Sequence, residues 1–270
     1  MSLYRVELKE LLVLAIPATL SQLSQMALGV IDTMMAGRVN PEALAAIAVG
    51  TNILNPIIVF ILGVFLALNP IVAHLNGRGD FNRIGTVFQH AVFLALVLAV
   101  PTILIIRNTE WIMSLIGIQP SLIPIVDGYL DACSYGLVGL FIFLALRFCN
   151  EGLFANKAIM IVTISSIPFN IVCNYWFIWG GFGIEPMGVI GVGYATSVVW
   201  FVMFLGLASY TVFTKRYQHL SITDQLHKYN WPQLKEFFTL GLPMGVGVAM
   251  EVAMFAIIGL LIGRYTIDVV

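Results

Sequence analysis

Charged residues are scarce in this sequence: they make up 10% of its 270 residues, against roughly a quarter in an ordinary soluble domain. Hydrophobic residues make up 60% of the chain. A water-soluble globule cannot hide that much apolar surface, so the composition excludes one. The 13 basic and 14 acidic residues nearly cancel, so no net charge points to nucleic acid or to an acidic partner.

Cysteines are few, and enzyme motifs are missing. Cys133, Cys149 and Cys173 all fall in apolar stretches without a paired spacing. This pattern favours packing thiols over a disulfide framework or a zinc site. The sequence holds no H-E-x-x-H, G-x-S-x-G or Walker lysine motif. We therefore predict that the chain is not an enzyme and needs no cofactor.

Long apolar runs are what the sequence has in abundance. A helix that crosses a bilayer needs about 20 consecutive, mostly apolar residues. Seven stretches meet that length, near Leu11–Ala36, Ala46–Ala73, Thr86–Ile106, Pro124–Cys149, Ala158–Trp179, Gly188–Phe213 and Phe237–Gly263. The first run is longer than the apolar core of a signal peptide, which is about 7–15 residues. The sequence therefore predicts an all-α, polytopic membrane protein.

The basic residues indicate how these helices are oriented. If the N-terminus is cytoplasmic, 10 of the 13 basic residues fall in inner segments. They are Arg5, Lys9, Arg78, Arg83, Arg147, Lys157, Lys215, Arg216, Lys228 and Lys235. Short cytoplasmic loops are enriched in Lys and Arg, so we predict a cytoplasmic N-terminus.

One segment of the sequence is repeated. The run Lys9–Pro17 reappears as Lys235–Pro243 at a constant offset of 226 residues, and under this offset Gln25 meets Glu251. Both copies open an apolar run, and the even number of helices between them makes the repeat parallel in topology. Parallel repeats are one known plan of secondary transporters. We expect the seventh helix to be the structural counterpart of the first, in a second, pseudo-symmetric lobe.

This repeat predicts the domain organisation. The sequence ends just after the seventh run, so we expect a truncated chain and about 12 helices in the complete protein. Residues 1–214 are then an N-terminal six-helix lobe, 215–236 a cytoplasmic inter-lobe linker, and 237–270 the first helix of a C-terminal lobe. The alternative is a genuine seven-helix protein in which the similarity arose by chance.

Three acidic residues, Asp32, Asp131 and Glu251, fall well within the apolar runs. A carboxylate at the bilayer centre costs about 2.5–3.5 kcal/mol on insertion scales, so each needs a reason to be there. Glu251 lies near the middle of its run and suits a group that alternately holds a proton, a metal ion or a cationic substrate. The alternative is a structural, neutral glutamate that bonds a neighbouring helix. Asp131 we interpret as interfacial.

Asp32 shares a helical face with Ser21 and Gln25. Such a polar stripe favours a protein interior or a water-filled cavity over lipid. The alternative places Asp32 at the membrane interface, paired with Arg38.

A second polar face is predicted in the fifth run, where Ser166, Asn170 and Asn174 recur every four residues. Amide oxygens bind hard cations and hydrogen-bond carboxylic acids. Packing contacts between helices are an equally good interpretation of these amides taken alone.

Four segments together resemble the multidrug and toxic compound extrusion transporters, in particular their NorM-like bacterial branch. They are Gly29–Gly37, Ala73–Gly79, Phe169–Trp176 and the helix that carries Glu251. The resemblance runs over the whole sequence. It implies two six-helix lobes around a V-shaped cavity, in a protein of the bacterial inner membrane. It also implies export of organic cations driven by inward flow of sodium ions or protons.

The resemblance also implies roles for particular residues. Asp32, Asn170 and Asn174 match the coupling-ion site of the N-terminal lobe, and Thr196 is expected to join it. Glu251 matches the cation-binding glutamate of the C-terminal lobe. Asp32 and Glu251 are in addition the expected substrate-binding residues. Some relatives carry Asp where this chain has Asn174, which leaves one carboxylate fewer here.

These features support a cation-coupled multidrug antiporter that acts on small organic cations within the bilayer, as a monomer when full length. The first alternative is a lipid-linked oligosaccharide flippase of the same superfamily. The second is a non-transporting membrane enzyme or receptor. Flippases of this kind need a strongly cationic cavity, and only Arg147 lies within the runs, near an inner end.

Overall fold

Helices make up nearly all of the computed structural model, which describes residues 2–181, 183–220, 222 and 231–266. The elements are α1 (Ser2–Gly37), α2 (Pro41–Leu66), α3 (Leu68–Arg78), α4 (Phe81–Ile106), α5 (Glu110–Ile116), α6 (Ile123–Gly152), α7 (Asn156–Trp179), α8 (Val189–Phe213), the 3-10 helix η1 (Lys215–Leu220) and α9 (Trp231–Thr266). Within these ranges, extended pairing is limited to one bridge between Gly181 and Ile184. The predicted all-α fold is confirmed.

Six segments of the described chain are long and apolar enough to cross a membrane. They are Leu11–Gly37, Pro41–Arg78, Phe81–Ile106, Ile123–Gly152, Asn156–Trp179 and Val189–Phe213. Each overlaps one of the first six predicted runs. The seventh run lies within α9, which begins at Trp231, ahead of the predicted helix start at Phe237.

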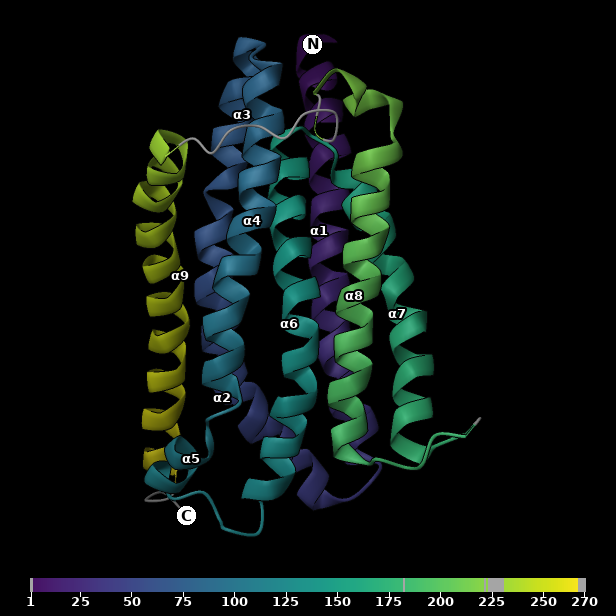
Figure 1. The fold of residues 1–270 in the computed structure, drawn as a ribbon, viewed down its shortest axis with the longest axis vertical. Coiled ribbons are helices and arrows are strands. Elements are labelled where there is room, and N and C mark those ends of the chain that lie inside the picture. The colour runs from purple at the N-terminus through teal and green to yellow at the C-terminus, as the bar shows by residue number, and fades with distance from the viewer. Residues whose placement is uncertain (1, 182, 221, 223–230, 267–270) are drawn as a thin grey trace.

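Successive membrane segments run in opposite directions (Figure 1). The N-terminus, the α3–α4 turn and the start of α9 therefore lie at one end of the molecule. The short helix α5 lies at the other end. The segments that carry Arg78, Arg83 and Lys235 lie at this N-terminal end. These basic residues were predicted to lie on the same side of the membrane as the N-terminus.

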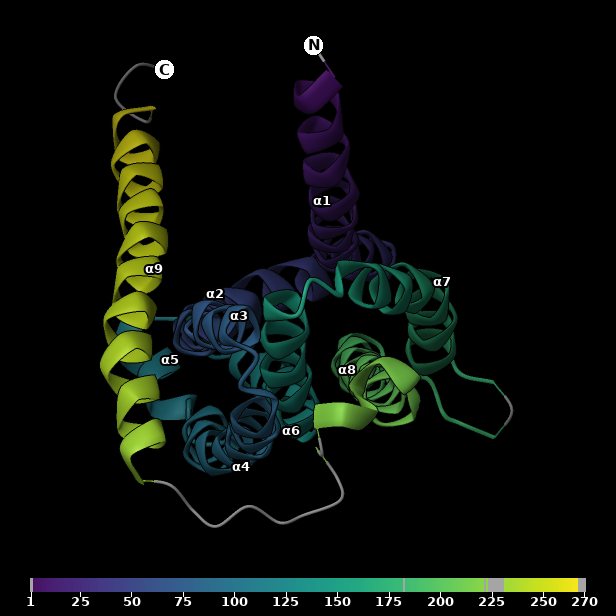
Figure 2. The same cartoon turned by 90° about the horizontal axis from the view of Figure 1, so that it is seen from above.

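The central helix is α6, which stands between α2–α4 on one side and α7–α8 on the other (Figure 2). Most of its length is buried, because neighbouring helices cover it on every side. Small residues allow the close approach to α8: a Cβ atom built on Gly136 would lie 2.5 Å from the Cα of Ser197. The Ser197 hydroxyl also donates to the carbonyl of Ala132 at 2.7 Å. Close packing and interhelical hydrogen bonds are what join helices in a membrane.

A tight turn joins α3 to α4. Gly79 adopts a left-handed conformation, with φ of 72°, that ends α3. Asp80 then caps α4, since its side chain accepts a hydrogen bond from the backbone N–H of Arg83 at 3.4 Å. The turn thus brings the ends of both helices together, with Arg78 on one side and Arg83 on the other.

The last helix, α9, packs against α2. Contact is made through glycines: Cβ atoms built on Gly241 and Gly245 would lie 2.7 Å from the carbonyl oxygen of Val64 and 2.9 Å from that of Phe60, respectively. Both α1 and α9 contain an internal proline, Pro17 and Pro243. These prolines are the residues that the sequence repeat aligns.

Candidate functional site

The candidate site is built around the carboxylate of Asp32, on α1. Its Oδ1 atom accepts a hydrogen bond from the Asn174 Nδ2 atom at 2.6 Å and another from the Asn170 Nδ2 atom at 3.0 Å. These amides are also linked to each other, because Asn174 Nδ2 lies 3.2 Å from Asn170 Oδ1. Asp32 is 9% exposed, and both asparagines are buried.

Helix α8 completes this group. The Thr196 hydroxyl lies 3.2 Å from Asp32 Oδ2 and 2.9 Å from the carbonyl oxygen of Val192 in its own helix. Residues from three helices therefore surround one carboxylate. The structure brings together Asp32, Asn170, Asn174 and Thr196, which the sequence analysis had grouped.

The polar face predicted on the fifth run is present on α7, where Ser166, Asn170 and Asn174 are all buried. Only the two asparagines reach Asp32. The Ser166 hydroxyl instead donates to the carbonyl of Thr163 at 2.7 Å. The serine therefore bonds within α7, whereas the asparagines contact a carboxylate on α1.

The partners of Asp32 are neutral. Arg38, the alternative partner, is exposed at the end of α1, and the ion pairs found in the described part of the chain do not include Asp32. When it is ionised, a buried carboxylate that receives only neutral donors carries an uncompensated negative charge. Beside it, the Oδ1 atom of Asn174 is buried without a hydrogen-bond partner. A proton or a bound cation would compensate the charge of Asp32.

A cleft of about 480 Å³ opens next to the carboxylate. Its walls come from α1, α2, α6, α7 and α8. Polar side chains that line it with Asp32 include Gln22, Gln25, Thr51, Asn55, Asn170 and Thr196. Tyr129 and Trp200 add aromatic surface. An apolar and aromatic cleft with a few polar groups is the usual form of a small-molecule site.

Glu251 does not join this group. It is exposed on α9, and α9 packs on α2 through the face that carries Phe60 and Val64. Phe60 and Val64 do not line the Asp32 cleft, and neither does Glu251. The structure therefore leaves Glu251 apart from the Asp32 cleft.

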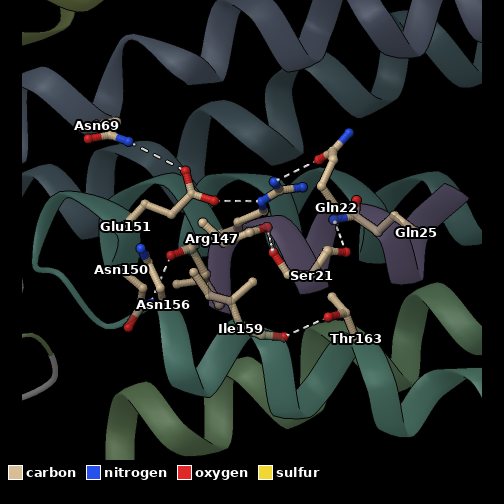
Figure 3. Close-up of polar contacts among 12 residues, drawn as sticks. Ser21, Gln22, Gln25, Asn69, Arg147, Asn150, Glu151, Asn156, Ile159 and Thr163 are labelled. Atoms are coloured by element: carbon tan, nitrogen blue, oxygen red, sulfur yellow. Dashed lines mark hydrogen bonds and ion pairs between the residues drawn. The ribbon is translucent and has the colours of Figure 1, made fainter. Parts of the chain in front are cut away.

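A second buried polar cluster was missed by the sequence analysis (Figure 3). Arg147 Nε lies 2.8 Å from Glu151 Oε1, and Arg147 Nη2 lies 3.2 Å from Gln22 Oε1. Asn69 Nδ2 contacts Glu151 Oε2 at 3.4 Å. The side chains of Arg147 and Glu151 are only 8% and 16% exposed. Their spacing of four residues along one helix was the signal that could have revealed the pair.

Among the described residues, no group of three or more His, Cys, Asp or Glu side chains could hold a metal ion. The three cysteines are free and buried, in agreement with their predicted packing role. Asp131 forms an ion pair with Arg107 at 3.0 Å, with both side chains partly exposed, as expected of an interfacial residue. Any cation at Asp32 would therefore be held by one carboxylate and by amide and hydroxyl oxygens.

Solved structures share this fold. The chain superposes with a TM-score of 0.86 on the eukaryotic MATE transporter AtDTX14, at 19% identity over 96% of this chain and 56% of that one. It matches an outward-facing MATE family transporter of the MOP superfamily with a TM-score of 0.79, at 22% identity over 91% of this chain and 54% of that one. At these identities the likeness shows the fold alone.

Curated relatives are more similar in sequence. The chain is 35% identical over 260 residues to the probable multidrug resistance protein NorM of Mannheimia succiniciproducens, covering 96% of this chain and 56% of the relative. It is 39% identical over 263 residues to the multidrug resistance protein MdtK of Yersinia enterocolitica, covering 97% of this chain and 58% of the relative. The chain thus spans little more than half the length of these relatives.

The names of these relatives describe drug resistance proteins and not enzymes, as the sequence analysis predicted for this chain. The sequence model of the MatE family matches residues 17–176, which include Asp32, Asn170 and Asn174. This match covers more than half of the chain and agrees with the resemblance found in the sequence. The chain therefore belongs to the MatE family, that of the multidrug and toxic compound extrusion proteins.

Proposed function

We propose that this protein is a multidrug efflux transporter that exports organic cations in antiport with sodium ions or protons. The observation that carries the proposal is the carboxylate of Asp32, which is buried beside a cleft and bonded only to neutral groups. The relatives named as multidrug resistance proteins support drug efflux as the activity.

Asp32 is proposed to alternate between two partners. In one state the carboxylate attracts a cationic substrate into the cleft, where Tyr129 and Trp200 offer aromatic faces. In the other state a proton or sodium ion occupies the carboxylate, with Asn170, Asn174 and Thr196 as neighbours. Arrival of the ion removes the charge that holds the substrate. It therefore favours release, because a ligand shifts an equilibrium only through its different affinities for two states.

The whole protein is proposed to contain two lobes. Residues 1–214 form one lobe, 215–236 a linker and 237–270 the beginning of a second lobe, which holds Glu251 as its cation site. We call a protein in which this chain is joined to a complete second lobe the two-lobe protein. It acts as a monomer in the bacterial inner membrane, with a cytoplasmic N-terminus and no cofactor apart from the coupling ion.

The flippase alternative is not favoured. A pyrophosphate-linked substrate requires a cationic cavity, yet the described lining of the Asp32 cleft contains no Arg or Lys side chain. Arg147 is neutralised by Glu151 at 2.8 Å. The electrostatics of the cleft suit a cation and not a polyanion.

Ethidium efflux from vesicles that contain the two-lobe protein tests this function. We expect efflux to follow an imposed sodium or proton gradient and to stop when both gradients are collapsed. Efflux that continues without either gradient would contradict ion-coupled antiport.

A further inference from the structure

We propose that the cleft between α3, α4 and α9 binds a phospholipid with a phosphoethanolamine headgroup. This site lies outside the Asp32 cleft and does not depend on the transport function. The cleft has a volume of about 580 Å³, within the usual range for ligand sites. The three helices are neighbours at the N-terminal end of the molecule (Figures 1 and 2).

The charged residues of this cleft lie at its membrane-interface end. Arg78 is the last residue of one membrane segment, and Arg83 lies in the first turn of the next. Both line the cleft, and both are exposed. Two guanidinium groups at the depth of the headgroups are suited to a lipid phosphate, which they can bind through paired hydrogen bonds.

Apolar residues continue the cleft from this charged end into the membrane segments. On α4, Val87, Ala91 and Leu94 follow Arg83 along one helical face, and on α3 the face of Arg78 continues through Leu75, Ile71 and Leu68. Eleven residues separate Arg83 from Leu94, which corresponds to roughly 16 Å along a helix. Two histidines, His74 and His90, also line this part of the cleft, which is otherwise apolar. A site that is cationic at the interface and mostly apolar below it matches an amphipathic lipid and not a soluble phosphate.

A carboxylate on the rim selects the headgroup. Glu236 of α9 lines the cleft and is exposed. Asp80 lies beside Arg83, with 3.8 Å between Asp80 Oδ2 and Arg83 Nε. Asp80 is thus already paired with Arg83, and a purely anionic headgroup would bring no cation to the Glu236 carboxylate. The ammonium group of phosphoethanolamine can donate to a carboxylate while its phosphate contacts the arginines.

Native mass spectrometry of the 270-residue chain in detergent, titrated with dioleoyl phosphatidylethanolamine or with dioleoyl phosphatidylglycerol, tests the site. We expect one phosphatidylethanolamine to be retained in preference to phosphatidylglycerol. Arg78→Gln and Arg83→Gln should each weaken its binding by about fivefold. The matched control Arg38→Gln, an exposed arginine at the other end of α1, should leave binding unchanged.

A second variant tests whether Glu236 recognises the headgroup separately from phosphate binding by the arginines. Glu236→Gln should abolish the preference for phosphatidylethanolamine over phosphatidylglycerol while one lipid is still retained. Binding that is unchanged in both arginine variants would overturn the site. A preference for phosphatidylglycerol in the parent chain would overturn the headgroup assignment. Equal competition by soluble phosphoethanolamine would overturn the role of the apolar cleft.

Discussion

Gly63 of α2 and Gly245 of α9 lie so close together that a Cβ atom on Gly63 would be 2.6 Å from the Cα of Gly245. No side chain separates the two helices at this point. The contact attaches α9 to α2 at Phe60, Gly63 and Val64, none of which lines the Asp32 cleft. The two glycines are far apart in the chain. The local pattern of polar and apolar residues therefore could not predict that α9 packs on α2.

Replacing Gly245 with leucine should therefore weaken the attachment of α9. Overpacking a close contact costs about 1–3 kcal/mol of folding free energy, because the backbones must move apart. Chemical unfolding in detergent micelles measures this loss. The matched control is Gly247→Leu on the same helix, where a new Cβ atom meets nothing within 4 Å. Equal stability of the two variants would contradict the proposed contact.

Glu151 should be needed to neutralise Arg147. In the variant Glu151→Ala the arginine charge remains buried without its counter-charge, which costs about 3–5 kcal/mol of folding free energy. Replacing both residues with leucine should recover most of that loss. The exposed pair formed by Arg107 and Asp131 is the control, since removing a partner there should cost less than about 1 kcal/mol. Similar losses at both pairs would show that burial does not control the effect.

Thr196→Val should shift the ion dependence of efflux without abolishing transport. Valine keeps the shape of threonine but removes the hydroxyl that lies 3.2 Å from Asp32 Oδ2. We expect the ion concentration for half-maximal efflux to shift by about tenfold or more, because one hydrogen bond to a charged group is worth about 1.5–3 kcal/mol. The shift is to higher concentration for sodium, which loses a hydroxyl ligand, and to lower concentration for protons, because the ionised carboxylate loses a donor. Thr239→Val, at an exposed threonine on α9 that donates to the carbonyl of Lys235 in its own helix, is the control. An unchanged ion dependence in Thr196→Val would remove Thr196 from the site.

The 270-residue chain alone should not carry out gradient-driven drug export. Alternating access in repeat transporters needs two units that move against each other around a shared site, and this chain spans little more than half the length of its relatives. Ethidium efflux from vesicles that contain only this chain is the measurement. Export driven by an imposed gradient would contradict the two-lobe proposal.

The fold was predictable where the local sequence carries the signal. Apolar runs of bilayer length located the membrane segments, and the four-residue spacing of Ser166, Asn170 and Asn174 located a buried face. The grouping of Thr196 with Asp32 was predictable only through the family resemblance, because the contact joins residues 164 positions apart.

Other features depend on three-dimensional contacts that no local pattern specifies. The pair of Arg147 and Glu151 has a local four-residue spacing, but the contact of Arg147 with Gln22 joins α6 to α1. Arg78 and Arg83 were counted for orientation only. Their position over an apolar cleft depends on the turn at Gly79 and on the docking of α9.

Glu251→Gln removes the titratable carboxylate of the proposed second cation site and keeps the shape of the side chain. We expect it to stop ion-driven export by the two-lobe protein while membrane insertion is preserved. Its exposure in the present chain agrees with a site whose other residues belong to the second lobe. Normal efflux by this variant would make Glu251 a structural residue.

The proposed role of the Asp32 carboxylate in ion coupling is tested most directly by ethidium efflux. The measurement uses the Asp32→Asn variant of the two-lobe protein under imposed sodium and proton gradients. Asparagine keeps the shape of the side chain and its hydrogen-bonding capacity but removes the charge. The control is Asp131→Asn, at the partly exposed acid that pairs with Arg107. We expect Asp32→Asn to insert into the membrane and to lose ion-driven efflux, while Asp131→Asn transports normally. Efflux by Asp32→Asn at the normal rate, with unchanged ion dependence, would contradict this role of Asp32.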